Sequence, residues 1–177
     1  GIANNHSLSF DGVDDYVSFS PFEYQSFNSL GSFTIKYSLY VNAINQGRVV
    51  CYDPNSNGSF FIQSSFWNNN LNFTVSHQIG TNSPSSAVNF TNFPTDTFVS
   101  VAFVYDQGDM GLYVNGVEVD NNTFTGPFSS SASGNLYFGY VPTDPNERFS
   151  GFLDNVEIWS WALSQTEIQQ YMDCPPA

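Results

Sequence analysis

The feature that most constrains this chain is a succession of short runs in which apolar and polar residues alternate. Clusters of Gly, Asn, Asp, Ser and Pro separate the runs. The clearest run is 33–41, where apolar side chains at the odd positions alternate with Thr34, Lys36, Ser38 and Tyr40. A period of two is that of a β-strand. We expect the odd positions to face a core and the even positions to face water, as in an antiparallel sheet with one solvated side.

The runs predict a chain built almost entirely of strands. We expect strands over residues 7–10, 16–19, 33–41, 48–52, 59–64, 71–76, 87–90, 98–106, 111–114, 117–119, 136–140 and 151–161. Asn115-Gly116 between two alternating runs predicts a hairpin, since a type I′ turn needs positive φ at both central residues. No long helical patterns separate the strands, so the predicted fold is all-β: two antiparallel sheets packed as a β-sandwich. An aromatic content of 18% fits that class.

The end of the chain carries the sharpest local signal. Residues 151–161 predict a long strand with one carboxylate, Asp154, inside it. A capping box follows, with Ser164 as the N-cap and Glu167 three residues later, which predicts one short C-terminal helix over 165–172. Pro175 stops this helix. We expect a single domain over 1–173 and the start of a linker over 174–177.

The charge of the chain excludes several kinds of partner. Lys36, Arg48 and Arg148 stand against 16 carboxylates, giving a formal charge of −13. Nucleic acid needs clustered Lys and Arg to neutralise its phosphates, so it is not an expected partner. No run of 18 apolar residues is present, so we expect no membrane insertion. The excess carboxylate either keeps an exported protein soluble or converges on a hard cation such as calcium.

The two cysteines do not decide whether the chain contains a disulfide. Cys51 and Cys174 could pair in an exported chain and fasten the C-terminal segment to an early strand. Cys174 directly precedes Pro175-Pro176. It could equally be unpaired or belong to a following segment.

Several blocks of the sequence resemble a known family. Residues 7–17, 32–35, 101–106 and 112–116 are similar to successive blocks of laminin-G-like, concanavalin A-like jelly-roll domains, and 151–168 resembles their ending. The blocks occur in family order over nearly the whole chain. Two positions depart from the pattern, because Ser38 and Phe98 stand where the family usually has tryptophan. The tail is similar to the junction that follows such domains in large secreted bacterial proteins, which implies a multidomain parent.

The resemblance implies an extracellular or cell-surface module that binds carbohydrate or mediates cell adhesion, with a structural calcium ion near the first and last strands. The matching residues are Asp11, Asp15 and Asp154. Calcium prefers six to eight oxygens, which an Asp-Gly turn supplies from carboxylates and carbonyls. The ion would also neutralise Asp154, for which Arg148 is the nearest other partner. The alternative is that Asp11 and Asp14 make turn hydrogen bonds and Asp154 bonds backbone amides.

Binding of a glycan or polysaccharide needs aromatic platforms and polar side chains in loops. The candidate ligand-binding residues are Tyr52, Asp53, Trp67, Asn68, Asn69, Asn70 and Tyr140. The alternative is that the aromatics belong to the core and the asparagines to an ordinary turn. We expect a monomer whose other partners are the neighbouring domains of its parent.

A catalytic role is the remaining question. Glycoside hydrolases related by fold carry a Glu-x-Asp-x-(x)-Glu strand, which places carboxylates on one face. Glu118-Val119-Asp120 supplies the first half, but the third carboxylate is missing. We therefore expect no catalytic residues. A structural spacer and an accessory module of a polysaccharide-degrading enzyme are the alternatives to a binding module.

Overall fold

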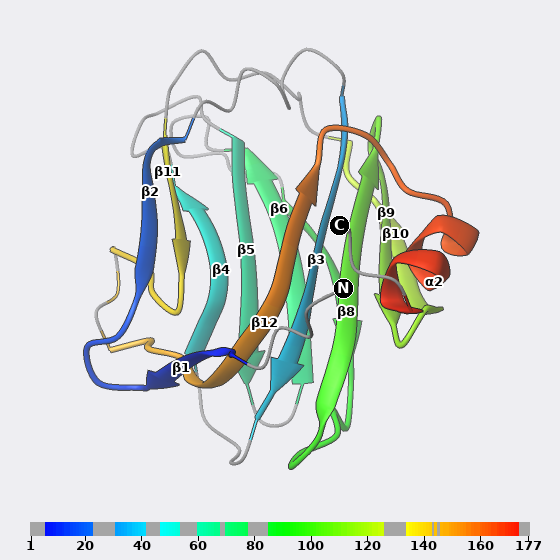
Figure 1. The fold of residues 1–177 in the computed structure, drawn as a ribbon. Helices are drawn as coiled ribbons and strands as arrows, with labels where there is room; N and C mark the ends of the chain where they lie inside the picture. Colours follow the sequence, from blue (N-terminus) through cyan, green and yellow to red (C-terminus); the bar gives the residue numbers. More distant parts are fainter. Residues whose placement is uncertain are drawn as a thin grey trace.

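The protein is described here by a computed structural model that covers residues 6–22, 31–41, 47–53, 60–67, 70–77, 85–125, 134–142, 144 and 146–173. Two sheets of six antiparallel strands pack face to face (Figure 1). Sheet A has the order β1 (Leu8–Asp11), β12 (Ser150–Trp159), β3 (Ser32–Tyr40), β8 (Phe98–Asp106), β9 (Asp109–Val114) and β10 (Val117–Thr123). Sheet B has the order β2 (Val17–Phe22), β11 (Gly134–Phe138), β4 (Gly47–Asp53), β5 (Phe60–Trp67), β6 (Asn70–His77) and β7 (Ser85–Phe90). The predicted all-β sandwich is confirmed, with a strand at each predicted position.

The core between the sheets is rich in aromatic rings. Phe73 of β6 and Phe103 of β8 stack with their centroids 4.4 Å apart and their planes 1° from parallel. The hydroxyl of Tyr37 and the Oγ of Ser64 form a hydrogen bond of 2.9 Å inside this core. A buried hydroxyl needs such a partner, so the pair joins β3 of one sheet to β5 of the other without an unsatisfied polar group.

Two tight turns fix one edge of sheet A. Asn115 and Gly116 have φ angles of 49° and 74°, and Val114 pairs with Val117 across them. This confirms the predicted hairpin between β9 and β10. Gln107 and Gly108 also have positive φ and join β8 to β9. The three strands therefore form one meander at this edge.

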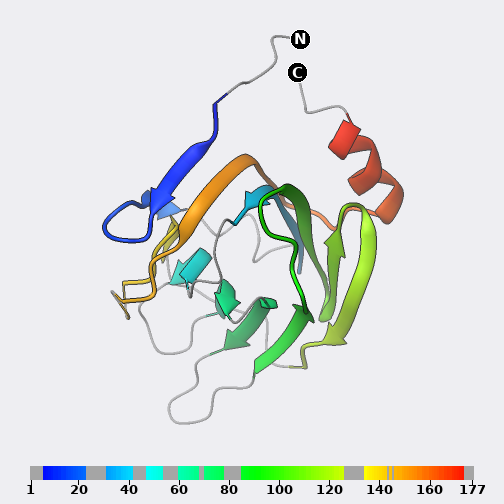
Figure 2. The ribbon, with the colours of Figure 1, turned by 90° about the horizontal axis from the view of Figure 1, so that it is seen from below.

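The C-terminal helix forms as predicted, over α2 (Gln165–Asp173). The amide of Ser164 donates to Glu167 Oε2 at 2.8 Å, and the amide of Glu167 approaches Ser164 Oγ at 3.4 Å. These bonds form the capping box. The Ser164 hydroxyl, which donates to Glu167 Oε2 at 2.7 Å, and then the Ser164 amide lower the pKa of Glu167. Leu163 and Ile168 are buried against Ala102 and Val104 of β8. The helix therefore lies on the outer side of sheet A, beside β9 and β10 (Figure 2).

The outer face of β3 is not exposed to solvent at Thr34 and Lys36. The prediction that the even positions of this strand face water is therefore wrong for these two residues. Thr34 is fully buried and Lys36 is 3% exposed. The hydroxyl of Thr34 donates to Trp161 O and accepts from the amide of Leu163, both at 2.9 Å. The ammonium of Lys36 donates to Glu157 Oε2 at 2.9 Å and to Tyr171 O at 3.0 Å. Both polar side chains are thus covered by the chain that leads into α2 and by its last turn.

The predictions about membrane insertion, the cysteine pair and the domain boundary are tested only in part by the structure. Among the described residues, no helix is long and apolar enough to cross a membrane. Cys51 is buried in β4, while Cys174 and the predicted linker lie outside the described residues. The pairing of the cysteines and the domain boundary stay predictions.

The buried ion pair gives a stability prediction. Lys36→Met removes the cation and leaves the Glu157 carboxylate, 14% exposed, without it. We expect the free energy of unfolding in urea to fall by about 3 kcal/mol, because one charge of a buried pair is stranded. The double variant Lys36→Met/Glu157→Leu should recover most of that loss, since an apolar pair strands no charge. A single variant within about 0.5 kcal/mol of the wild type would contradict the analysis.

Candidate ligand-binding site

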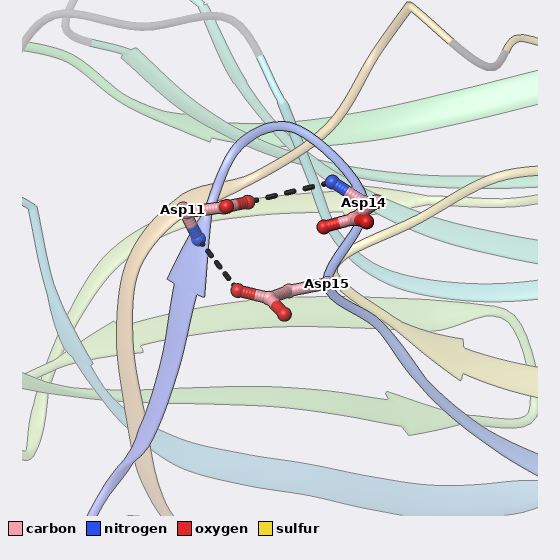
Figure 3. A group of neighbouring side chains, drawn as sticks. All are labelled: Asp11, Asp14 and Asp15. Atoms are coloured by element: carbon pink, nitrogen blue, oxygen red, sulfur yellow. Dashed lines mark hydrogen bonds between the residues drawn. The ribbon is translucent and has the colours of Figure 1, made fainter.

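The first site element is the turn between β1 and β2, which we call the acidic turn (residues 11–15). Asp11 ends β1 opposite Ser150 of β12, and Gly12 follows with a φ of 80° that reverses the chain. Asp11 Oδ1 accepts hydrogen bonds from the amides of Val13 at 2.7 Å and Asp14 at 3.4 Å. Asp15 Oδ2 accepts from the amide of Asp11 at 3.0 Å (Figure 3). The aspartates therefore shape this turn themselves, as the alternative interpretation of the sequence held for Asp11.

The same turn gathers three exposed carboxylates. One oxygen each of Asp11, Asp14 and Asp15 lies within 4.8 Å of the others. Hydrogen bonds from the backbone, above all from Val13, lower the pKa of Asp11, so this carboxyl stays ionised. Carboxylates together with turn carbonyls are the donors that calcium takes, so the donor set fits this ion. Three side chains are fewer than its six to eight ligands, and carbonyls or water would complete the shell.

Beside the acidic turn lies a group that we call the tyrosine–arginine stack: Tyr16, Tyr140 and Arg148. The guanidinium carbon of Arg148 lies 4.1 Å from the ring centroid of Tyr140 and 5.7 Å from that of Tyr16. The two ring centroids are 5.2 Å apart. Arg148 Nη1 also donates to Asp14 O at 3.3 Å, which links the stack to the turn. Tyr16 is 52% exposed, so an apolar ring is open to solvent next to a cation and three carboxylates.

Strand pairing explains why these residues meet. Val17 of β2 pairs with Phe138 of β11, which places Tyr16 beside the chain that continues to Tyr140. The amide of Phe149 donates to Gly139 O at 3.1 Å, and this bond holds the segment before β12 against the same place. The site lies at the lower left of Figure 1, where the β1–β2 turn meets the end of β11.

The prediction that Asp154 belongs to the acidic turn is wrong. Asp154 pairs with Ser38 of β3, while Asp11 pairs with Ser150. Ser150 and Asp154 are four positions apart in β12, roughly 13 Å along a strand. Asp154 is half-buried at the start of a bulge, and its Oδ1 accepts from the amide of Asn155 at 2.8 Å. A backbone amide is its hydrogen-bond partner, as in the alternative interpretation.

The predicted glycan-binding residues do not form one rim. Tyr52 is 2% exposed in the core, and a buried ring offers no face to a ligand, so Tyr52 is wrong as a platform. Asp53 is the last residue of β4, paired with Asn135 at the end of sheet B that lies away from Tyr140. Trp67 is 48% exposed and ends β5.

The end of sheet B that carries Tyr140 also carries Trp67. Phe66 pairs with Gly47 at the start of β4, and Trp67 pairs with Asn70 at the start of β6. This position is two strands away from β11 in the sheet. Asn68 and Asn69 lie outside the described residues. Of the predicted set, only Tyr140 is part of the stack beside the acidic turn.

Sequence analysis did not assign three members of the site: Asp14, Tyr16 and Arg148. Asp14 and Tyr16 belong to the run 11–16, whose three aspartates and following aromatic were a usable signal. Arg148 had none, because the sequence does not show how the chain folds back between Tyr140 and Arg148, and Tyr16 is distant in sequence. The hydrogen bond from the Phe149 amide to Gly139 O holds Arg148 near Tyr140, and the pairing of β2 with β11 brings Tyr16 to both.

Comparison with known proteins agrees with this fold. The family model Laminin_G_3, the concanavalin A-like lectin/glucanases superfamily, matches residues 11–169. The chain belongs to this superfamily. No curated protein matches the chain.

Solved structures share the jelly roll of this superfamily at low identity. The native heptameric SAP-like pentraxin from Limulus polyphemus is 18% identical with a TM-score of 0.69, over 96% of this chain and 82% of the pentraxin. The binding domain of botulinum neurotoxin DC in complex with rat synaptotagmin II is 16% identical with a TM-score of 0.73, over 98% of this chain and 44% of that one. The same toxin domain in complex with SialylT is 14% identical with a TM-score of 0.71, over 98% and 43%. Our chain thus spans less than half of these toxin chains, and the likeness concerns the fold alone.

The hydrogen bonds of Asp11 give a prediction about its titration. We expect the pKa of Asp11 in the folded chain to lie below its ordinary value of 3.8, as measured by carboxyl ¹³C chemical shifts. The stability that these bonds contribute is then complete above the unfolded pKa and is lost as the pH falls through the folded value. The urea-unfolded chain is the comparison and should titrate higher. A folded value equal to or above the unfolded one would contradict the geometry.

Proposed function

We propose that this domain is a noncatalytic, extracellular carbohydrate-binding module whose site consists of the acidic turn and the tyrosine–arginine stack, with calcium held by the turn. The observation that carries the proposal is the position of Arg148, which contacts both tyrosine rings and donates to Asp14 O. This position gathers an exposed ring, a cation and three carboxylates in one place. Membership of a lectin/glucanase superfamily supports the same class of ligand.

The residues divide the work of recognition by their chemistry. The open ring of Tyr16 packs against the apolar face of a sugar ring, and the guanidinium of Arg148 donates to its oxygens. Arg148 is held by Tyr140 and by the Asp14 carbonyl, so little side-chain freedom is lost when it binds. Asp11, Asp14 and Asp15 would hold calcium, which would offset their mutual repulsion and fix the turn. Calcium affinity rises with the number of charged ligands. Three carboxylates therefore predict the weak binding that is typical of extracellular modules.

Support for a noncatalytic role comes from the strand that carries the incomplete hydrolase pattern. Glu118 pairs with the outward residue Tyr113, but a register shift follows, and Asp120 pairs with the buried Leu112. Asp120 Oδ2 accepts from the amide of Asn89 at 2.7 Å. The two carboxylates therefore differ in surroundings, and a carboxylate pair for acid–base work needs both at one bond.

The calcium part of the proposal predicts a stability change. Thermal melts should show a higher midpoint with calcium than with a chelator, corresponding to about 2.7 kcal/mol at a hundredfold excess over Kd. Asp14→Asn/Asp15→Asn should abolish that difference, because two of three carboxylate ligands become neutral amides. Asp154→Asn is the matched control and should keep it in full. Loss of the calcium response in the control, with retention in the double variant, would place the ion on β12.

The carbohydrate part predicts binding on a glycan array in calcium buffer. Tyr16→Ala should weaken binding to the recognised glycan about three- to tenfold, since ring contacts contribute about 0.5–1.5 kcal/mol. Trp161→Ala is the matched control, because Trp161 is 49% exposed and lies outside the site. Silence of the folded wild type across neutral and acidic polysaccharides would instead favour a structural spacer.

A further inference from the structure

A concave site lies on the outer face of sheet A, away from the acidic turn. It is a groove of about 530 Å³ between the β9–β10 hairpin and the residues that lead into α2. This volume is within the range of small-ligand sites. Figure 2 shows α2 beside β9 and β10, and the residues that line the groove lie on β8, β9, β10 and the segment before α2.

The floor of the groove is formed by the outward positions of β8 and β9. Met110, Leu112 and Val114 of β9 are buried in the core, so Asp109, Gly111 and Tyr113 lie on the outer side. The ring of Tyr113 lies across Gly111, because a Cβ there would be only 3.0 Å from Cε2 of that ring. The groove is lined here by this tyrosine ring and, from β8, by Val104.

The walls are polar on one side and apolar on the other. Along β10, Glu118 pairs with Tyr113, Asn121 with Gly111 and Thr123 with Asp109. The register shift after Glu118 keeps all three on the outer face. Ala162, Leu163 and Ser164 form the opposite wall. Hydroxyl and amide groups thus face an apolar surface across the groove.

The charge of the groove has one sign. Asp106, Asp109 and Glu118 line it, and no Lys, Arg or His does. Burial, and then the charge of Glu118, raises the pKa of Tyr113, in keeping with a carboxylate close to this ring. The carboxylate of Glu167 caps the first turn of α2, so the helix end offers no uncompensated positive charge.

The cations of the described chain are engaged elsewhere. Lys36 pairs with Glu157 and Arg48 with Glu147, while Arg148 belongs to the stack beside the acidic turn. The groove charge is therefore left for a ligand to complement.

We propose that this groove binds a saccharide that carries protonated amino groups, such as an oligomer of glucosamine. The ammonium groups meet Glu118 and Asp109, the hydroxyls bond Asn121 and Thr123, and a sugar ring packs against Tyr113. This site shares no residue with the acidic turn or the stack. Experiments on the groove therefore test this proposal independently of the function proposed above.

The edge of sheet A favours a saccharide over a basic peptide. Extended peptides commonly bind by adding a strand to a free edge. The outer side of β10 is already joined to β7, because Asn122 Nδ2 donates to Ala87 O and Ser86 Oγ donates to Thr123 O, both at 2.9 Å. Asn89 also donates its amide to Asp120. Side chains, not a free strand edge, make up this groove, and their mixture of carboxylate, amide, hydroxyl and ring suits an amino sugar.

Calorimetry with the whole chain tests the proposal, using the tetramer of glucosamine, its fully N-acetylated form and tetralysine as probes. We expect the glucosamine tetramer to bind and the N-acetylated tetramer not to bind, because acetylation removes the charge. Added salt should weaken the binding. Glu118→Gln should weaken it about tenfold, since a charge-assisted bond becomes a neutral one. Gly111→Ala should also weaken it, because the added methyl group would displace the ring of Tyr113.

Controls decide between this groove and other sites. Asp96→Asn removes an exposed carboxylate outside the groove and should change nothing. No binding by the folded wild type, or binding unaffected by Glu118→Gln, overturns the proposal. Loss of binding in Asp14→Asn/Asp15→Asn overturns it in favour of the acidic turn. Tetralysine that binds as tightly, with the same dependence on Glu118, overturns the saccharide class in favour of a basic peptide.

Discussion

The rest of this structure depends on the pairing of β12 with two strands that are distant in sequence. On one side β12 pairs with β1, which sets Asp11 opposite Ser150. On the other side it pairs with β3, which sets Glu157 opposite Lys36. The first pairing anchors the acidic turn, and the second anchors the chain that leads into α2. A strand near the end of the chain therefore positions both the acidic turn and the wall of the groove beside α2.

The same pairing explains how an acidic protein uses its few cations. Lys36 is buried, and its hydrogen bonds join β3 to β12 and to the end of α2. Arg148 stands directly before β12 and is carried to the two tyrosines by the path of that strand. Among the described residues, one cation lies beside the acidic turn and none lines the groove beside α2, so the two regions differ in charge.

The sequence was sufficient for the local structure and insufficient for contacts between distant segments. Period-two patterns, the Asn115-Gly116 turn and the Ser164–Glu167 capping box are read from neighbouring residues, and each is present in the structure. Thr34 and Lys36 appeared to face solvent because period two assigns a side of the sheet but does not say what covers it. The segment that covers them is more than a hundred residues away.

The errors at the site have the same cause. Asp154 was grouped with Asp11 because the family resemblance implies one calcium site for both and the carboxylate in β12 needs a partner. The register separates the two residues, and a bulge supplies Asp154 with a backbone amide. Tyr52 was named for its place next to a turn, although the strand that carries it is buried on both sides of the sheet at that point. Register and layer packing are properties of the whole fold, and residue patterns within one strand do not contain them.

The central claim is that the β1–β2 turn, with the stack beside it, is the ligand-binding site of this domain. Backbone amide chemical shifts, recorded by NMR while calcium and then the recognised glycan are added, test it most directly. The account predicts that calcium shifts the amides of Val13, Asp14 and Asp15, that the glycan then shifts Tyr16 and Arg148, and that Asn155 stays unchanged throughout. Shifts centred on Asn155, or a glycan response that bypasses Tyr16 and Arg148, would contradict it.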